Sequence, residues 1–148
     1  MATANIYLTF NGNCEEAFQL YKSVFGGEFP YIGRYSDMPQ ESGTCPPGDL
    51  NKVMHISLPI SKETVLMGCD GITTPDRPFV EGNNFAISVN AASREEADCI
   101  FAGLAASGNI VMPMDTTFWG AYFGMLTDKF GISWMISYEA PQGQEENK

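Results

Sequence analysis

The chain contains the same strand–helix pattern twice, at an offset of about 80 residues. Residues 6–11 alternate as a strand does, and a helix follows that opens at Asn13. Residues 85–90 alternate in the same way, and a second helix opens at Ser93. Both helices carry Glu-Glu-Ala in the first turn. A unit repeated at half the chain length predicts two similar modules within 148 residues.

The two helices have start signals that rest on hydrogen bonding. Asn13 and Ser93 are residue types whose side chains cap the free N–H groups of a first turn. Glu16 and Glu96 stand three residues further on, where a capping box places its acid. Apolar residues then recur at helical spacing, which predicts one face packed on a core. In the first helix these are Cys14, Ala17, Phe18, Tyr21, Val24 and Phe25, and in the second Ala97, Ile100, Phe101, Leu104 and Ala105.

Three strand-like segments follow each helix, so each half is expected to run strand–helix–strand–strand–strand. The segments are 28–35, 53–60, 64–69, 110–117, 121–127 and 133–138. Stretches rich in Gly and Pro, 36–50 and 70–83, interrupt the pattern as loops. We predict a first module at about 1–70, a linker at 71–83, a second module at about 84–140 and a short acidic tail at 141–148.

Composition limits the partners of such a chain. Hydrophobic residues make up 44%, which is enough for a core, and the net charge is −10. A surface this negative repels phosphate groups, which argues against binding to nucleic acid or to an anionic membrane. No segment approaches the roughly 20 apolar residues of a membrane span, and the N-terminus has no signal core, so we expect a cytoplasmic protein. The cysteines, expected to be free thiols, form no C-x-x-C pair: Cys14, Cys45, Cys69 and Cys99.

The module order and several local sequences resemble the vicinal oxygen chelate superfamily of glyoxalases, bleomycin-resistance proteins and dioxygenases, and its PhnB-like branch in particular. The resembling stretches are residues 10–17, 21–27, 53–56, 66–70, 119–131 and 134–136. The resemblance implies an α+β fold in which two βαβββ modules form a cup-shaped mixed eight-stranded sheet with outer helices. It also implies a homodimer with a small-molecule site in the cup.

The superfamily's metal-dependent members take His, Gln or Glu ligands from the first and last strands of each module. By the resemblance these positions fall near Asn5, Met67, Asn84 and Met135. Thioethers suit soft Cu(I), and neutral amides alone bind divalent ions poorly, so we expect neither a metal nor another cofactor. Some relatives carry a label as ubiquinone-pathway methyltransferases. The chain has no strand–glycine loop–helix unit for a nucleoside cofactor, so that label is not transferred.

Strand alternation suggests which side chains point into the cup and which toward the helices. On the helix side we expect Ile6, Leu8, Phe10, Met54, Ile56, Leu58, Phe85, Ile87, Val89, Trp134, Ile136 and Tyr138. The candidate ligand-binding residues are Tyr7, Thr9, His55, Ser88, Trp119, Tyr122 and Met135.

His55 is the single histidine and the candidate catalytic residue, because its ordinary pKa lies near neutral pH. The alternative is a histidine satisfied within the sheet or at a dimer contact. Arg34 and Arg77 either hold a carboxylate or phosphate of a ligand or make surface or interface pairs. Cys69 is expected to be structural, and Asp70 to form a turn.

Three functions fit these observations. The first, which we predict, is a homodimer that binds an unknown small molecule in the cup without a metal. The second is an enzyme of the lyase, isomerase, dioxygenase or thiol-transferase type that uses His55 or an atypical metal site. The third is a structural or interaction dimer whose cup is filled by its own side chains, with Met67 and Met135 pointing inward.

Overall fold

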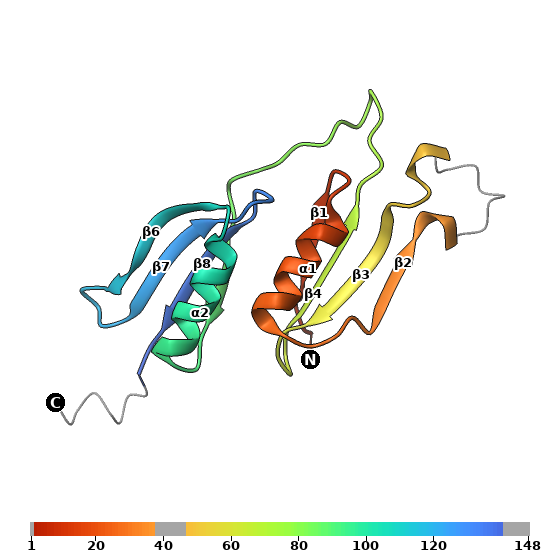
Figure 1. Ribbon diagram of the computed structural model, residues 1–148. Coiled ribbons are helices and arrows are strands. Elements are labelled where there is room, and N and C mark those ends of the chain that lie inside the picture. Colours follow the sequence, from red (N-terminus) through yellow and green to blue (C-terminus); the bar gives the residue numbers. More distant parts are fainter. Residues whose placement is uncertain (1, 38–46, 141–148) are drawn as a thin grey trace. The chain divides into compact units, whose positions relative to one another are not determined.

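Each half of the chain forms a four-stranded sheet with one helix, as the sequence repeat predicts (Figure 1). The computed structural model describes residues 2–37 and 47–140, and it divides into two compact units between Val80 and Glu81. The predicted acidic tail, Cys45 and most of the predicted loop 36–50 lie outside the described residues.

In the first unit the strands take the order β1-β4-β3-β2. The elements are β1 (Ile6–Phe10), α1 (Cys14–Phe25), β2 (Tyr31–Arg34), β3 (Val53–Pro59) and β4 (Val65–Asp70), with single 3-10 turns at Tyr35–Asp37 and Pro47–Asp49. β1 pairs with β4 in parallel, and the other pairs are antiparallel. The first and last strands of the unit are therefore neighbours.

The second unit repeats this arrangement with the order β5-β8-β7-β6. Its elements are β5 (Ile87–Asn90), α2 (Arg94–Ala105), β6 (Asn109–Thr116), β7 (Tyr122–Thr127) and β8 (Ser133–Tyr138). β5 pairs with β8 in parallel. The prediction of two βαβββ modules is thereby confirmed. In the described part of the chain, no helix is long and apolar enough to cross a membrane.

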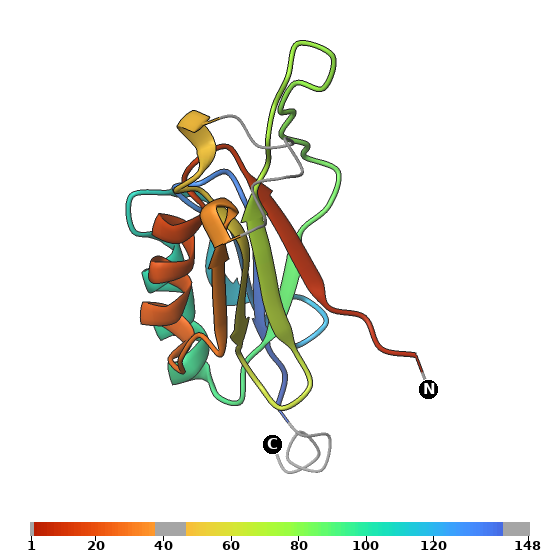
Figure 2. The ribbon, with the colours of Figure 1, turned by 90° about the vertical axis from the view of Figure 1, so that its right-hand side faces the viewer.

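The core of the first unit lies between α1 and one face of its sheet. Figure 2 shows α1 along that face. Leu8 and Phe10 alternate inward from β1, whereas Tyr7 and Thr9 stay exposed on the opposite face. The remaining buried apolar residues are Cys14, Ala17, Phe18, Tyr21, Val53, Ile56, Leu58 and Leu66.

An irregularity in β3 corrects one predicted orientation. Gly33 pairs with His55, but the next residue of β2, Arg34, pairs with Val53, so Met54 is skipped in the register. Such a bulge reverses the alternation beyond it. Val53 is consequently buried and Met54 only half-buried, the opposite of the prediction that Met54 faces the helix.

The second unit buries Trp134 and Ile136 from β8 together with Leu126 from β7, on the side of α2. Four of the five helix positions predicted to face the core are buried: Ala97, Ile100, Phe101 and Leu104. Phe85 is an exception to the predicted alternation. It lies before β5 begins and is 58% exposed, because the strand starts only at Ile87.

The two helices begin in different ways. Ser93 caps α2 as predicted, with its hydroxyl accepting a hydrogen bond from the N–H of Glu96 at 3.0 Å. The Glu96 carboxylate in turn accepts from the N–H of Ala92 at 2.8 Å. The side chain of Asn13, by contrast, makes no capping bond at α1. The prediction of an Asn13 cap was wrong.

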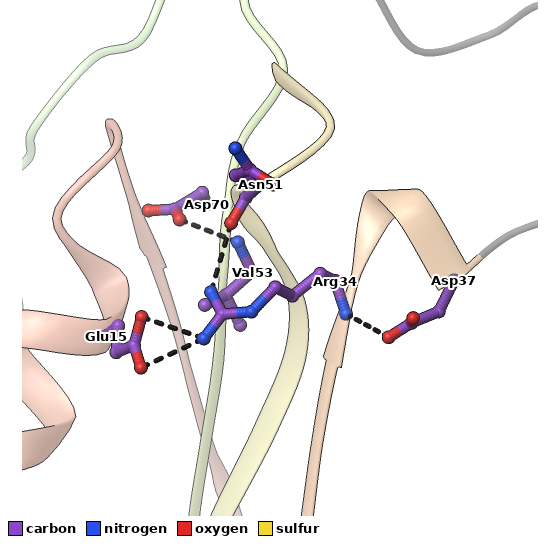
Figure 3. A network of polar contacts seen from close by, with 6 residues as sticks. All are labelled: Glu15, Arg34, Asp37, Asn51, Val53 and Asp70. Carbon is purple, nitrogen blue, oxygen red and sulfur yellow. Dashed lines mark hydrogen bonds and ion pairs between the residues drawn. The ribbon is translucent and has the colours of Figure 1, made fainter. Parts of the chain in front are cut away.

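The side chain of Asp70, and not that of Asn13, caps the start of α1. One carboxylate oxygen accepts from the N–H groups of Gly12 at 3.0 Å and Cys14 at 2.9 Å. The other accepts from the N–H of Val53 at 2.9 Å (Figure 3). Asp70 is 2% exposed, so the predicted turn former is a buried acceptor that ties α1, β3 and β4 together.

Candidate functional site

His55 lies on the face of the first sheet opposite α1, between two tyrosines from other strands. The ring centroid of Tyr7, from β1, is 5.6 Å from that of His55. The ring centroid of Tyr31, from β2, is 5.8 Å away. The Tyr7 hydroxyl and the His55 Nδ1 lie 3.3 Å apart, and the tautomer of the imidazole sets the direction of that hydrogen bond. The structure thus brings Tyr7 and His55 together as predicted and adds Tyr31.

Strand register explains the cluster. Tyr7 pairs with Met67, Met67 with Ser57 and Ser57 with Tyr31, which makes one row across all four strands. Directly paired residues share a face of the sheet, so this row lies on one side. We call the set Tyr7, Thr9, Tyr31, His55, Met67 and Cys69 the His55 face.

Tyr31 was missed in the sequence, although one signal pointed to it. Gly33 stands two residues later in the same strand and therefore on the same face. A Cβ at position 33 would collide with the Tyr31 hydroxyl, so the tyrosine side chain lies over the glycine. Gly33 also pairs with His55, which brings the Tyr31 ring toward the imidazole.

The phenol of Tyr7 has a perturbed pKa on the His55 face. Burial raises the pKa of Tyr7 from its ordinary value of 10.0 to about 12, and a hydrogen bond with Cys69 adds to this pKa shift. Tyr7 is therefore a protonated phenol at neutral pH. Both flanking rings remain accessible, with Tyr7 49% and Tyr31 48% exposed.

In the second unit, Ser88 and Met135 lie on the sheet face opposite α2. They pair with each other across β5 and β8, and Met135 also pairs with Met125. Trp119, in the turn between β6 and β7, places its ring centroid 6.3 Å from that of Phe123. Thr9 belongs with His55 in the first unit. That the His55 face of the first unit and the residues Ser88, Trp119 and Met135 of the second line one cup stays a prediction.

Tyr122 does not lie on that face, which corrects the predicted orientation. It pairs with Tyr138 and shares the parity of buried Trp134, on the side of α2. Its hydroxyl donates to Asp98 of α2 at 2.6 Å. The guanidinium of Arg94 lies 4.0 Å from the centre of its ring. Tyr122 is therefore not placed with Ser88 and Met135, as the sequence had suggested, because strand register sets the face on which its side chain lies.

The Arg34 side chain makes an ion pair and a hydrogen bond with residues of the same unit. Its guanidinium donates to both carboxylate oxygens of Glu15 at 3.0 Å and to the carbonyl of Asn51 at 3.0 Å (Figure 3). The Glu15 carboxylate raises the pKa of Arg34 further. Of the two predicted roles, the structure supports a surface pair over a ligand anchor for Arg34. Arg77 lies in an exposed turn, where its N–H donates to the carbonyl of Thr74 at 3.0 Å.

The four positions that correspond to superfamily metal ligands do not suit a divalent ion. The Asn5 side-chain oxygen accepts from the N–H of Val65 at 3.1 Å, so it is used in holding β4. Met67 and Met135 offer thioethers, and Asn84 is an exposed amide. Within residues 2–37 and 47–140, no three His, Cys, Asp or Glu side chains gather in a way that could hold a metal ion.

Comparison with known proteins agrees with this architecture. A family model described as 3-demethylubiquinone-9 3-methyltransferase matches residues 2–137. Protein YjdN of Escherichia coli (strain K12) is 33% identical over 138 residues, covering 88% of this chain and 91% of that protein. Protein PA1353 from Pseudomonas aeruginosa has a solved structure with 37% identity and a TM-score of 0.81, covering 94% of this chain and 98% of that one.

Two further solved structures define the class. The PhnB protein from Bacillus cereus is 28% identical with a TM-score of 0.73, over 93% of this chain and 99% of that one. A glyoxalase/bleomycin resistance protein from Albidiferax ferrireducens T118, at 16% identity, shares the fold with a TM-score of 0.56, over 90% of this chain and 97% of that one. The fold is that of the glyoxalase/bleomycin resistance class. Within it, the chain belongs to the PhnB-like family whose model is described as 3-demethylubiquinone-9 3-methyltransferase.

Proposed function

We propose that the protein binds a small, neutral, planar molecule on the His55 face and uses no divalent metal to do so. The observation that carries this proposal is the imidazole of His55 between two half-exposed tyrosine rings, at 5.6 and 5.8 Å. Aromatic side chains give a flat ligand large contact area at low entropic cost, and the phenol and imidazole groups provide hydrogen bonds that orient it.

The groups on this face favour an uncharged ligand. Tyr7 and Tyr31 present phenols, and Thr9 adds a hydroxyl. The chain as a whole carries a net charge of −10, which disfavours an anionic ligand at long range. A phenol, a quinol or another planar ring with one or two hydrogen-bonding groups matches this surface.

The turns before the two helices do not favour the methyl transfer that the name of the family model implies. A nucleoside cofactor in an α/β fold approaches the turn between a strand and the following helix. In the first unit, the N–H groups of Gly12 and Cys14 at this turn already donate to buried Asp70. In the second, the side chains of Glu96 and Ser93 accept hydrogen bonds from the N–H groups of Ala92 and Glu96. At both turns, side chains of the chain itself thus occupy backbone donors.

A second candidate function is acid–base catalysis by His55. The 3.3 Å contact between the Tyr7 hydroxyl and Nδ1 favours it, because a phenol and an imidazole in contact can pass a proton. The third alternative, a cup filled by Met67 and Met135, predicts no binding on this face. The homodimer that the superfamily forms remains part of the proposal, and light scattering that shows only monomers would contradict it.

The histidine makes a direct binding test possible. Because the chain has one histidine, its imidazole C–H signals can be identified in a proton NMR spectrum without assignment. We expect 1-naphthol, a planar neutral phenol, to shift these signals saturably in the full chain. Tyr31→Ala should weaken binding severalfold, as expected for a ring contact worth about 1 kcal/mol.

Tyr122→Phe is the matched control, since Tyr122 lies against α2 and away from Ser88 and Met135. It should bind 1-naphthol as the wild type does. Native mass spectrometry of chain purified without chelators would show whether a small molecule accompanies it. His55 signals that do not respond to 1-naphthol, or an unchanged affinity in Tyr31→Ala, would rule out binding on this face.

A further inference from the structure

Cys69 places a thiol beside His55 on the first sheet. Ile56 of β3 pairs with Gly68 of β4, and the strands are antiparallel. The next residues along, His55 and Cys69, are therefore cross-strand neighbours on the face opposite α1. The Cβ atoms of such neighbours lie about 5 Å apart. Cys69 is half-buried there, unlike Cys14, which is fully buried at the start of α1.

The Tyr7 hydroxyl links the thiol and the imidazole. It lies 3.3 Å from His55 Nδ1, and its interaction with the Cys69 side chain contributes to its raised pKa. Two adjacent strands therefore present sulfur and imidazole nitrogen on the same small area of the His55 face.

A third soft donor stands next to this pair. Met67 precedes Cys69 by two residues in β4 and so projects from the same face, in the row that begins with Tyr7. Thiolate, thioether and imidazole together select monovalent copper over the hard divalent ions. We propose that Cys69, Met67 and His55 form a binding site for Cu(I).

This site shares only Met67 with the four positions that correspond to superfamily metal ligands. It lies on the same face as the proposed organic ligand, and His55 is common to both. All three donors come from β3 and β4 of one unit, so the site is complete within residues 2–80. Binding exchanges one proton for the metal: the Cys69 S–H bond breaks, an S–Cu bond forms, and the proton passes to solvent. No electron is transferred, because copper enters already reduced.

Anaerobic titration of the full chain with Cu(I), in competition with the chromophoric chelator bicinchoninate, tests the proposal. We expect one copper ion per chain. Cys69→Ser should lower the affinity by at least about tenfold, His55→Ala by a similar factor and Met67→Leu by less. Cys99→Ser and Met112→Leu are matched controls from α2 and β6, and both should bind as the wild type does.

Melting curves of the metal-free variants confirm that each substitution leaves the chain folded. X-ray absorption at the copper edge should show sulfur and nitrogen neighbours. Copper retained in Cys69→Ser, or lost equally in Cys99→Ser, overturns the proposal. So does zinc bound more tightly than Cu(I), or copper held no more tightly than by the urea-unfolded chain.

Discussion

The carboxylate of Asp70, at the end of β4, accepts a hydrogen bond from the backbone N–H of Cys14 at 2.9 Å, so the last strand of the first unit holds the first turn of its helix. The two residues are 56 positions apart in the chain. The same carboxylate bonds Gly12 and Val53, and its burial means that no water replaces these contacts. One side chain therefore couples helix formation to completion of the sheet.

Replacing Asp70 with Asn should lower the free energy of unfolding by roughly 3 kcal/mol, because an amide nitrogen replaces one acceptor oxygen in front of backbone N–H groups. Urea denaturation measures this loss. Asp76→Asn, in the exposed linker, is the matched control and should change stability little. Equal stability of the two variants would show that the Asp70 bonds contribute nothing net.

Gly68→Ala should destabilise the first unit by about 1 to 3 kcal/mol through overpacking. The added Cβ would meet the Phe18 ring at 2.7 Å and the Leu8 carbonyl oxygen at 2.9 Å, and the carbonyl belongs to a paired strand that cannot move easily. At Gly48 an added Cβ would meet nothing within 4 Å. Thermal melts that show Gly68→Ala as stable as Gly48→Ala would contradict the close packing of β4 on α1.

The Tyr7 phenol should titrate at a pKa of about 12 rather than 10.0, visible as the difference in ultraviolet titration between the wild type and Tyr7→Phe. Since folding raises this pKa, the stabilisation is complete below pH 10 and is lost as the pH rises toward 12. The wild type should lose stability more steeply than Tyr7→Phe over this interval. Parallel curves would mean that Tyr7 has an ordinary pKa in the folded chain.

Asp128 and Trp134 should show a coupling energy of about 1 kcal/mol in a double-mutant cycle of Asp128→Asn and Trp134→Phe. The indole N–H of fully buried Trp134 donates to Asp128 at 2.9 Å, and the other Asp128 oxygen bonds the N–H groups of Phe130 and Ile132. The four free energies of unfolding come from denaturant titrations followed by circular dichroism. Strict additivity would argue against the indole bond as a stabilising contact.

Local features could be predicted from the sequence wherever neighbours along the chain decide them. Ser93 caps α2 because its acceptor and the N–H of Glu96 belong to the same turn. Leu8 and Phe10 turn inward because alternation needs no partner strand. Signals of this local kind, together with the strand-like segments after each helix, predict the βαβββ order.

Features that depend on distant partners could not be predicted in this way. Asp70 displaces Asn13 as the capping residue only because β4 ends beside α1. Tyr122 turns toward α2 because β7 is in register with β8, which composition does not reveal. The bulge that buries Val53 likewise arises from the pairing of β3 with β2. The candidate site was therefore only partly predictable, with His55 and Tyr7 found and Tyr31 missed.

The shared strand order has a consequence for synthesis on the ribosome. In the described strands, every partner of β1, β2, β3 and β4 is encoded before residue 71, and β4, the last to emerge, inserts between β1 and β3. The first sheet can therefore be assembled while the second half of the message is still being translated. The sheet is complete only once β4 has emerged, and β4 brings with it both Asp70 and the thiol beside His55.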